Sequence, residues 1–140
     1  MNKKLKIGIL VIGVIAIATA VMIIASSYRN LPNKVEIAEA IIKNGSGETL
    51  KIERTTAQDI VDILRKKMKS GDRMKMRFKN SITFLDANGK SLLELYFADP
   101  ALYDIRCSVL VDKKPYDVPE EFAQKIREIS NEKKFSLYQE

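Results

Sequence analysis

Residues 82–97 read ITFLDANGKSLLELYF, and this stretch decides the fold. Ile82 to Asp86 and Ser91 to Phe97 have the composition of two strands, and Ala87-Asn88-Gly89-Lys90 connects them. Asparagine and glycine tolerate the positive φ angles that a tight hairpin turn requires. The string from Asp86 to Gly89 also resembles the start of a calcium-binding loop, but it lacks the later ligands and the closing glutamate. The stretch therefore predicts a β-hairpin.

A second hairpin is predicted upstream of the first. Val35 to Lys43 and Thr49 to Arg54 are strand-like runs on either side of Asn44-Gly45-Ser46-Gly47. The glycines of this connection again supply the positive φ of a hairpin turn. We therefore expect the folded domain to begin with two neighbouring antiparallel strands.

A helix is predicted between the two hairpins. Thr55 and Thr56 open it, and Gln58 or Asp59, three residues later, completes a capping box. Ser70-Gly71 closes it, because glycine accepts the left-handed conformation at a helix end. Its buried face consists of apolar residues at helical spacing, namely Ala57, Ile60, Val61, Leu64 and Met68.

Alternation predicts two more strands. Met74, Met76 and Phe78 alternate with basic residues, which is typical of a strand with one apolar and one basic face. The last strand points one set of side chains inward, namely Tyr103, Ile105, Cys107, Val109 and Val111. It points another set outward, namely Asp104, Arg106, Ser108 and Asp112. Together with the two hairpins, these segments make about six strands.

A terminal helix follows the last strand. Asp117-Val118-Pro119 starts it, with acidic residues in its first turn and Lys133 and Lys134 near its end, as the helix dipole prefers. Its buried stripe is Phe122, Ala123, Ile126 and Ile129. The predicted order is therefore β-β-α-β-β-β-β-α, an α+β domain at 35–140 with a mainly antiparallel sheet packed against two helices.

The first part of the chain predicts a transmembrane helix. Residues 7–25 carry no charge and would span about 28 Å as a helix, which matches a hydrocarbon core of ~30 Å. Residues 1–6 form a basic stub that contains Lys3, Lys4 and Lys6, and residues 26–34 read as a short linker. Because the positive charge lies on the N-terminal side, we expect a single-pass signal-anchor in the cytoplasmic membrane with the domain outside.

A cleaved signal peptide is the alternative. Ala16-Ile17-Ala18 and Ala18-Thr19-Ala20 both have the small-residue pattern of a cleavage site, which would release the domain as a secreted protein. The apolar run nevertheless continues to Ile24, longer than the roughly 7 to 15 residues of a signal-peptide core. The uncleaved anchor is therefore favoured, and even a fully extended linker would keep the domain within about 30 Å of the bilayer.

The residue types that are missing limit the chemistry. The chain contains no histidine, which excludes Ser-His-Asp and Cys-His catalysis and the common zinc sites. The sequence predicts no catalytic, metal-binding or cofactor-binding residue and no cofactor. Cys107 is the only cysteine and lies on the apolar side of a predicted strand, so it is expected in the core without a disulfide. An exported domain without disulfides favours a bacterial envelope.

One segment carries a candidate binding surface. Residues 65–79, here called the basic stretch, hold eight basic residues against Asp72 alone, a net charge of +7, whereas the whole chain has +6. Such a concentration attracts an anionic partner. The candidate residues are Arg65, Lys66, Lys67, Lys69, Arg73, Lys75, Arg77 and Lys79. The alternative is a solvated basic face that only keeps the strand soluble.

Two functions remain open from the sequence. The favoured one is a non-enzymatic interaction module that binds an anionic lipid, a wall polymer or an acidic envelope protein through the basic stretch. Nucleic acid is disfavoured because Phe78 is the only aromatic residue among the basic ones. The other function is a small envelope enzyme that uses carboxylates or a Ser/Lys pair. The sequence predicts no oligomeric state.

Overall fold

The computed structural model describes Tyr28 and residues 30–72, 77–99 and 107–137. The strands are β1 (Glu39–Lys43), β2 (Thr49–Ile52), β3 (Lys69–Ser70), β4 (Asn80–Leu85), β5 (Ser91–Phe97), β6 (Cys107–Val111) and β7 (Lys114–Val118). The helices are the one-turn η1 (Lys34–Glu36), α2 (Arg54–Lys66) and α3 (Glu120–Lys133). The fold is a small α+β domain. No helix of these residues is long and apolar enough to span a membrane, and the predicted anchor at 7–25 lies outside them.

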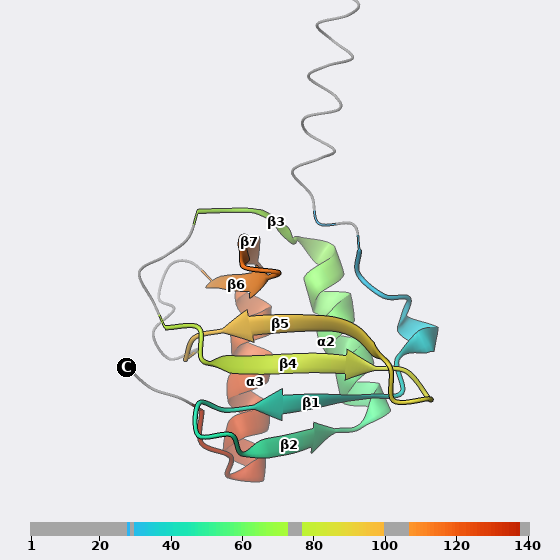
Figure 1. The fold of residues 1–140 in the computed structure, drawn as a ribbon. Helices are drawn as coiled ribbons and strands as arrows, with labels where there is room; N and C mark the ends of the chain where they lie inside the picture. The colour runs from blue at the N-terminus through green and yellow to red at the C-terminus, as the bar shows by residue number, and fades with distance from the viewer. Residues whose placement is uncertain (1–27, 29, 73–76, 100–106, 138–140) are drawn as a thin grey trace, which may run out of the picture.

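The seven strands form one antiparallel sheet in the order β2-β1-β4-β5-β6-β7-β3. Helices α2 and α3 both cover the same face of this sheet (Figure 1). The opposite side, here called the open face, carries no helix in the described part of the chain. The predicted antiparallel sheet with two helices is confirmed, with one strand more than expected.

Both predicted hairpins are present. In β4 and β5, Ile82 lies opposite Leu95, and Gly89 takes the positive φ of 79° in the turn between them. The Asp86 carboxylate accepts hydrogen bonds from the main-chain N–H groups of Asn88 and Lys90, both at 2.9 Å. This carboxylate therefore stabilises a turn, as expected for a hairpin. The first hairpin starts later than predicted, because residues 34–36 form η1 and leave β1 to begin at Glu39.

Helix α2 has the predicted buried face but different ends. Ala57, Ile60, Val61 and Leu64 are fully buried. The capping box is wrong, since the helix begins at Arg54 after Glu53, whose side chain makes no capping hydrogen bond. The closure at Ser70-Gly71 is also wrong, because α2 ends at Lys66 and Lys67 is extended.

Gly71 has a different role from the predicted helix cap. Its N–H donates a hydrogen bond to the Pro115 carbonyl at 3.2 Å, which extends the pairing of β3 with β7. A Cβ atom at Gly71 would lie 2.4 Å from Oδ1 of Asp117 in β7, far inside van der Waals contact. The φ of Gly71 is not positive, so glycine is favoured here by the closeness of the Asp117 carboxylate, which would have to move to admit a larger side chain.

The predicted last strand is followed by another one. β6 and β7 form a hairpin whose turn consists of Asp112 and Lys113, with positive φ angles of 50° and 66°. A two-residue turn of this kind usually contains glycine or asparagine. Because neither is present, the usual sequence signal for this hairpin is missing. Ser108, predicted to face outward, alternates with the core residues Cys107 and Val109 and is paired with Asp117, but it is fully buried.

The core lies between the sheet and the two helices. The stripe predicted for the terminal helix is buried, namely Phe122, Ala123, Ile126 and Ile129. Phe97 of β5 meets Phe122 of α3 edge to face, with ring centroids 5.9 Å apart. Cys107, Val109 and Val111 are buried as predicted, whereas residues 103–106 lie outside the described part. The core therefore joins segments from both halves of the domain.

Candidate functional site

The N-terminal end of the described chain is attached to the C-terminal end of α2. The N–H of Tyr28 donates a hydrogen bond to the Met68 carbonyl oxygen at 2.9 Å. The Tyr28 ring also meets the Tyr116 ring of β7 edge to face, with centroids 4.9 Å apart. Burial raises the pKa of the Tyr28 phenol, and Tyr116 and Asp112 add to the shift. Tyr28 is therefore a packed part of the domain.

Side chains of α2 hold the residues that follow Tyr28. Nη2 of Arg65 donates to the Pro32 carbonyl oxygen at 2.7 Å, and Nε2 of Gln58 donates to the Lys34 carbonyl oxygen at 2.9 Å. Nζ of Lys34 lies 2.8 Å from Oδ2 of Asp62, and this hydrogen bond raises the pKa of Lys34. The described part of the predicted linker thus lies along α2 rather than extending from the domain.

Four residues of the basic stretch gather at this end of α2. They are Arg65, Lys66, Lys67 and Lys69, here called the α2-end cluster, and all four are exposed. They border a depression of about 370 Å³ that is also lined by Tyr28, Leu31, Leu64 and Met68. The depression is therefore lined by both basic and apolar side chains.

The members of the α2-end cluster do not have the same partners. Arg65 is bonded to the Pro32 carbonyl, and Nζ of Lys66 lies 2.9 Å from Oε2 of Glu121 in α3. Within the described part of the chain, Lys67 and Lys69 have neither an ion pair nor a side-chain hydrogen bond. These two lysines flank Met68, to which Tyr28 is bonded. They are therefore the cations most available to an external anion.

The remaining residues of the basic stretch are not placed with this cluster. Arg73 and Lys75 lie outside the described residues. Arg77 and Lys79 are exposed and precede β4, which β5, β6 and β7 separate from β3 and Lys69. Residues 77–79 do not belong to a strand, although the sequence predicted one there. The basic residues of this stretch that the structure describes therefore lie in two separate regions of the domain.

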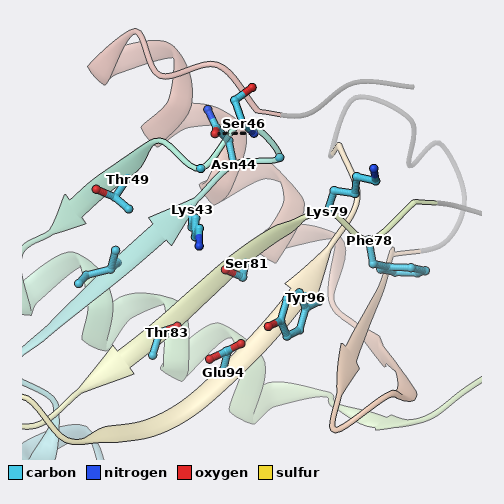
Figure 2. A pocket seen from close by; sticks show the side chains of 13 residues that line it. Lys43, Asn44, Ser46, Thr49, Phe78, Lys79, Ser81, Thr83, Glu94 and Tyr96 are labelled. Atoms are coloured by element: carbon cyan, nitrogen blue, oxygen red, sulfur yellow. Dashed lines mark hydrogen bonds between the residues drawn. The ribbon is translucent and has the colours of Figure 1, made fainter.

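A second concave region lies on the open face of the sheet. It has a volume of about 720 Å³ and extends from the turn at 44–47 over β1, β4 and β5. Figure 2 shows that Lys43, Ser81, Thr83, Glu94 and Tyr96 project from these strands on the side away from the helices. The lining is therefore mixed, with the apolar side chains of Ile41 and Phe78 beside hydroxyl groups, a carboxylate and an ammonium group.

Tyr96 lies at the centre of this face. Tyr96 is 42% exposed, and its interaction with the neighbouring Glu94 carboxylate raises the pKa of the Tyr96 phenol. A neighbouring depression of about 470 Å³ shares Phe78, Glu94 and Tyr96 with the first and reaches Leu110 and the turn at 112–113. The two depressions are neighbours on the open face and are here together called the open-face groove.

Sequence reasoning did not identify the open-face groove. The alternation in β5 could have placed Glu94 and Tyr96 opposite the core residues Leu93, Leu95 and Phe97, which are buried. An aromatic residue on the outer face of a strand was the available signal. The concavity itself depends on the neighbouring strands and had no signal in the sequence.

Neither region resembles a nucleophilic or metal centre. In residues 28, 30–72, 77–99 and 107–137, no cluster of three histidine, cysteine, aspartate or glutamate residues could hold a metal ion. Burial raises the pKa of the Cys107 thiol to about 12, so this group is protonated at neutral pH. A protonated, buried thiol is a poor nucleophile.

No known protein family, characterised relative or solved structure matches this chain.

Proposed function

We propose that this chain is a membrane-anchored binding module whose domain lies against the anionic surface of the bilayer through the α2-end cluster. The observation that carries the proposal is the hydrogen bond from the Tyr28 N–H to the Met68 carbonyl oxygen. This bond attaches the N-terminal side of the domain to the backbone between Lys67 and Lys69.

The position of the proposed anchor explains why this bond would bring Lys67 and Lys69 close to the membrane. The proposed transmembrane helix ends at Ala25, three residues before Tyr28. Three residues of extended chain reach at most about 11 Å. Lys67 and Lys69 would therefore lie at the level of the lipid headgroups. Each cation near an anionic membrane surface contributes about 1 kcal/mol of binding energy, and this attraction decays over a Debye length of ~8 Å.

The proposal gives the residues of the α2-end cluster two roles. Arg65 and Lys66 are bonded to Pro32 and Glu121, so their first role is to fix the N-terminal segment and α3 to α2. Lys67 and Lys69 carry the proposed contact with lipid. Leu31, the partly exposed apolar residue of the depression, can contact the glycerol end of a headgroup beside these charges.

Lysine footprinting of the full-length protein tests this proposal. The protein is reconstituted into nanodiscs of phosphatidylcholine alone or with phosphatidylglycerol, and lysine acetylation is measured by mass spectrometry. At low salt, anionic lipid should slow the acetylation of Lys67 and Lys69 by about threefold or more, and high salt should reverse the effect. Lys90, exposed in the β4–β5 turn, is the internal reference and should react equally in both bilayers.

A charge-matched pair of variants completes the test. Lys67→Glu with Lys69→Glu should abolish the lipid-dependent protection of the α2 end, measured by hydrogen exchange at Met68. The control variant, Lys90→Glu with Lys133→Glu, changes the net charge by the same amount at two other exposed positions. It should leave the lipid-dependent protection of Met68 intact. Equal acetylation of Lys67 and Lys69 in neutral and anionic bilayers at low salt would overturn the proposal.

A further inference from the structure

We propose that Asn88 is a site of spontaneous chemical modification, at which the side-chain amide is lost and the β4–β5 turn gains an aspartyl or isoaspartyl residue. The chain contains two Asn-Gly pairs, Asn44-Gly45 and Asn88-Gly89, each in a hairpin turn. The fold restrains the first asparagine and leaves the second one free to react. This inference concerns the turns alone and does not depend on contact with the bilayer.

The chemistry belongs to the Asn-Gly pair. The main-chain nitrogen of the glycine attacks the side-chain carbonyl carbon of the asparagine, a C–N bond forms, and the side-chain nitrogen leaves as ammonia with the proton of the attacking nitrogen. Water then opens the resulting succinimide ring at either carbonyl, which gives aspartate or isoaspartate. Glycine favours this reaction because it has no Cβ atom to block the approach and because its backbone is the most flexible.

Asn44 is held away from this reaction. It is only 5% exposed, and its Nδ2 donates a hydrogen bond to the Ser136 carbonyl oxygen at 2.8 Å. Its Oδ1 accepts hydrogen bonds from the N–H groups of Ser46, at 3.0 Å, and Glu48, at 2.9 Å (Figure 2). The reaction needs the side chain to swing toward the nitrogen of Gly45 and Nδ2 to leave. These hydrogen bonds must therefore break first.

Asn88 lacks these restraints. It is exposed, and its side chain makes no hydrogen bond within the described part of the chain. Apart from the chain neighbours of Gly89, no described atom lies within 4 Å of the position that a Cβ atom would take on this glycine. The Asn88 side chain therefore has room to close on the glycine. One main-chain bond of this exposed turn, from the Gly89 N–H to the Asp86 carbonyl oxygen at 3.0 Å, has to open.

The two turns have the same hydrogen-bond pattern, so their asparagines can be compared directly. The first residue of each turn, Asn44 or Asp86, is bonded through its main chain to the residues three and four positions later. Its side chain accepts hydrogen bonds from the N–H groups two and four positions later. Asn44 is the first residue of its turn, whereas Asn88 is the third residue of the other. The place of the asparagine in the turn therefore decides which pair reacts.

The modification changes the turn in which it occurs. An isoaspartyl residue carries the main chain through its side-chain carbon, which adds an atom to the backbone between Asp86 and Lys90. Either product also places a second carboxylate near Asp86, whose own carboxylate accepts a hydrogen bond from the N–H of residue 88. Because like charges repel, we expect the bond from the Asp86 N–H to the Lys90 carbonyl oxygen to weaken.

The test follows both pairs in the full-length protein. The protein is incubated in nanodiscs of neutral lipid in mildly alkaline buffer, with water enriched in heavy oxygen, and peptide mapping by mass spectrometry measures the loss of each amide. In the folded protein Asn88 should react about tenfold or more faster than Asn44. In urea the two rates should agree within about threefold, because the local sequence then determines both.

Variants and a second readout complete the test. Asn88→Gln keeps an amide but must close a larger ring, so the reaction at residue 88 should disappear while the rate at Asn44 stays unchanged. The isoaspartyl form, separated by ion exchange, should show hydrogen exchange at the Asp86 and Gly89 amides about threefold or more faster than the unmodified protein. Asn88→Asp carries the charge without the extra backbone atom and should exchange more slowly than the isoaspartyl form.

Three results would overturn the proposal. The first is equal reaction of Asn88 and Asn44 in the folded protein. The second is a folded protein that reacts at neither pair over the time in which the unfolded protein reacts at both. The third is an isoaspartyl form whose turn amides exchange as slowly as those of the unmodified protein.

Discussion

The side-chain amide of Asn44 donates a hydrogen bond to the main-chain carbonyl oxygen of Ser136 at 2.8 Å. This bond joins the first hairpin turn to the segment that follows α3. Oδ1 of the same side chain accepts hydrogen bonds from the N–H groups of Ser46 and Glu48, at 3.0 and 2.9 Å. Asn44 is only 5% exposed, and its one side chain bonds to three main-chain groups.

The first prediction concerns this contact. Asn44→Ala removes three partly buried hydrogen bonds, so the free energy of unfolding should fall by about 1–3 kcal/mol. Asn44→Asp should also destabilise, because a carboxylate cannot donate to the Ser136 carbonyl. Urea unfolding measures both. Asn88→Ala, in the exposed turn of the second hairpin, is the control and should change stability by less than about 0.5 kcal/mol.

The second prediction concerns Gly71 and Asp117. Gly71→Ala should destabilise by about 1–3 kcal/mol because its Cβ would collide with the Asp117 carboxylate. In an Asp117→Ala background the same change should cost less than about 0.5 kcal/mol. A double-mutant cycle in urea measures the coupling. Additive effects would show that Gly71 is required for another reason.

The third prediction concerns the ionisation of Cys107. Burial raises its pKa from 9.0 to about 12, so the folded state favours the neutral thiol. The contribution of the neutral thiol to the stability of the folded state is fully present below pH 9, the ordinary pKa of a cysteine. It is lost as the pH rises toward 12, the pKa in the folded state. Over this range the free energy of unfolding should fall by at most about 1.4 kcal/mol per pH unit because of this thiol.

Comparison with Cys107→Ala isolates this contribution, because the variant keeps every other titrating group. Urea unfolding between pH 8.5 and pH 11 should show a smaller loss of stability in Cys107→Ala than in the wild type. A thiol reagent should also label Cys107 slowly in the native protein and quickly in denaturant. Rapid native labelling would contradict the buried position.

The fourth prediction concerns Tyr28. Tyr28→Ala removes the edge-to-face contact with Tyr116 and should destabilise the attachment of the N-terminal segment by about 0.5–1.5 kcal/mol. Hydrogen exchange at the Tyr28 amide should become roughly tenfold faster, since this N–H is bonded to Met68. Tyr28→Phe keeps the ring and should exchange as the wild type does. Equal exchange in all three proteins would mean that the ring does not hold the segment.

Local patterns were sufficient for much of the fold. The helical spacing from Ala57 to Leu64 predicted the buried face of α2, and Gly89 predicted the β4–β5 turn. The spacing of a helix and the φ of a turn depend on a few neighbouring residues. The β6–β7 hairpin was missed for the same reason, because Asp112 and Lys113 take positive φ without a glycine or asparagine.

The candidate sites were less predictable. The sequence identified the basic stretch, but the fold divides its described residues between the end of α2 and the start of β4. The order of strands in the sheet decides that division, and strand order follows from contacts between distant segments. The open-face groove depends on the same order, because Lys43, Thr83 and Tyr96 come from three different strands.

The sequence by itself determined the class of fold, the two hairpins and the inward faces of both long helices, because periodicity and turn chemistry are local properties of the chain. Only the tertiary structure decided that Tyr28 is bonded to Met68, that Asp117 leans over Gly71, and that Glu94 and Tyr96 lie in a groove rather than on a flat face. These relationships join residues whose separation in the chain says nothing about their distance. They form because burying one common core brings the segments together in a single sheet order.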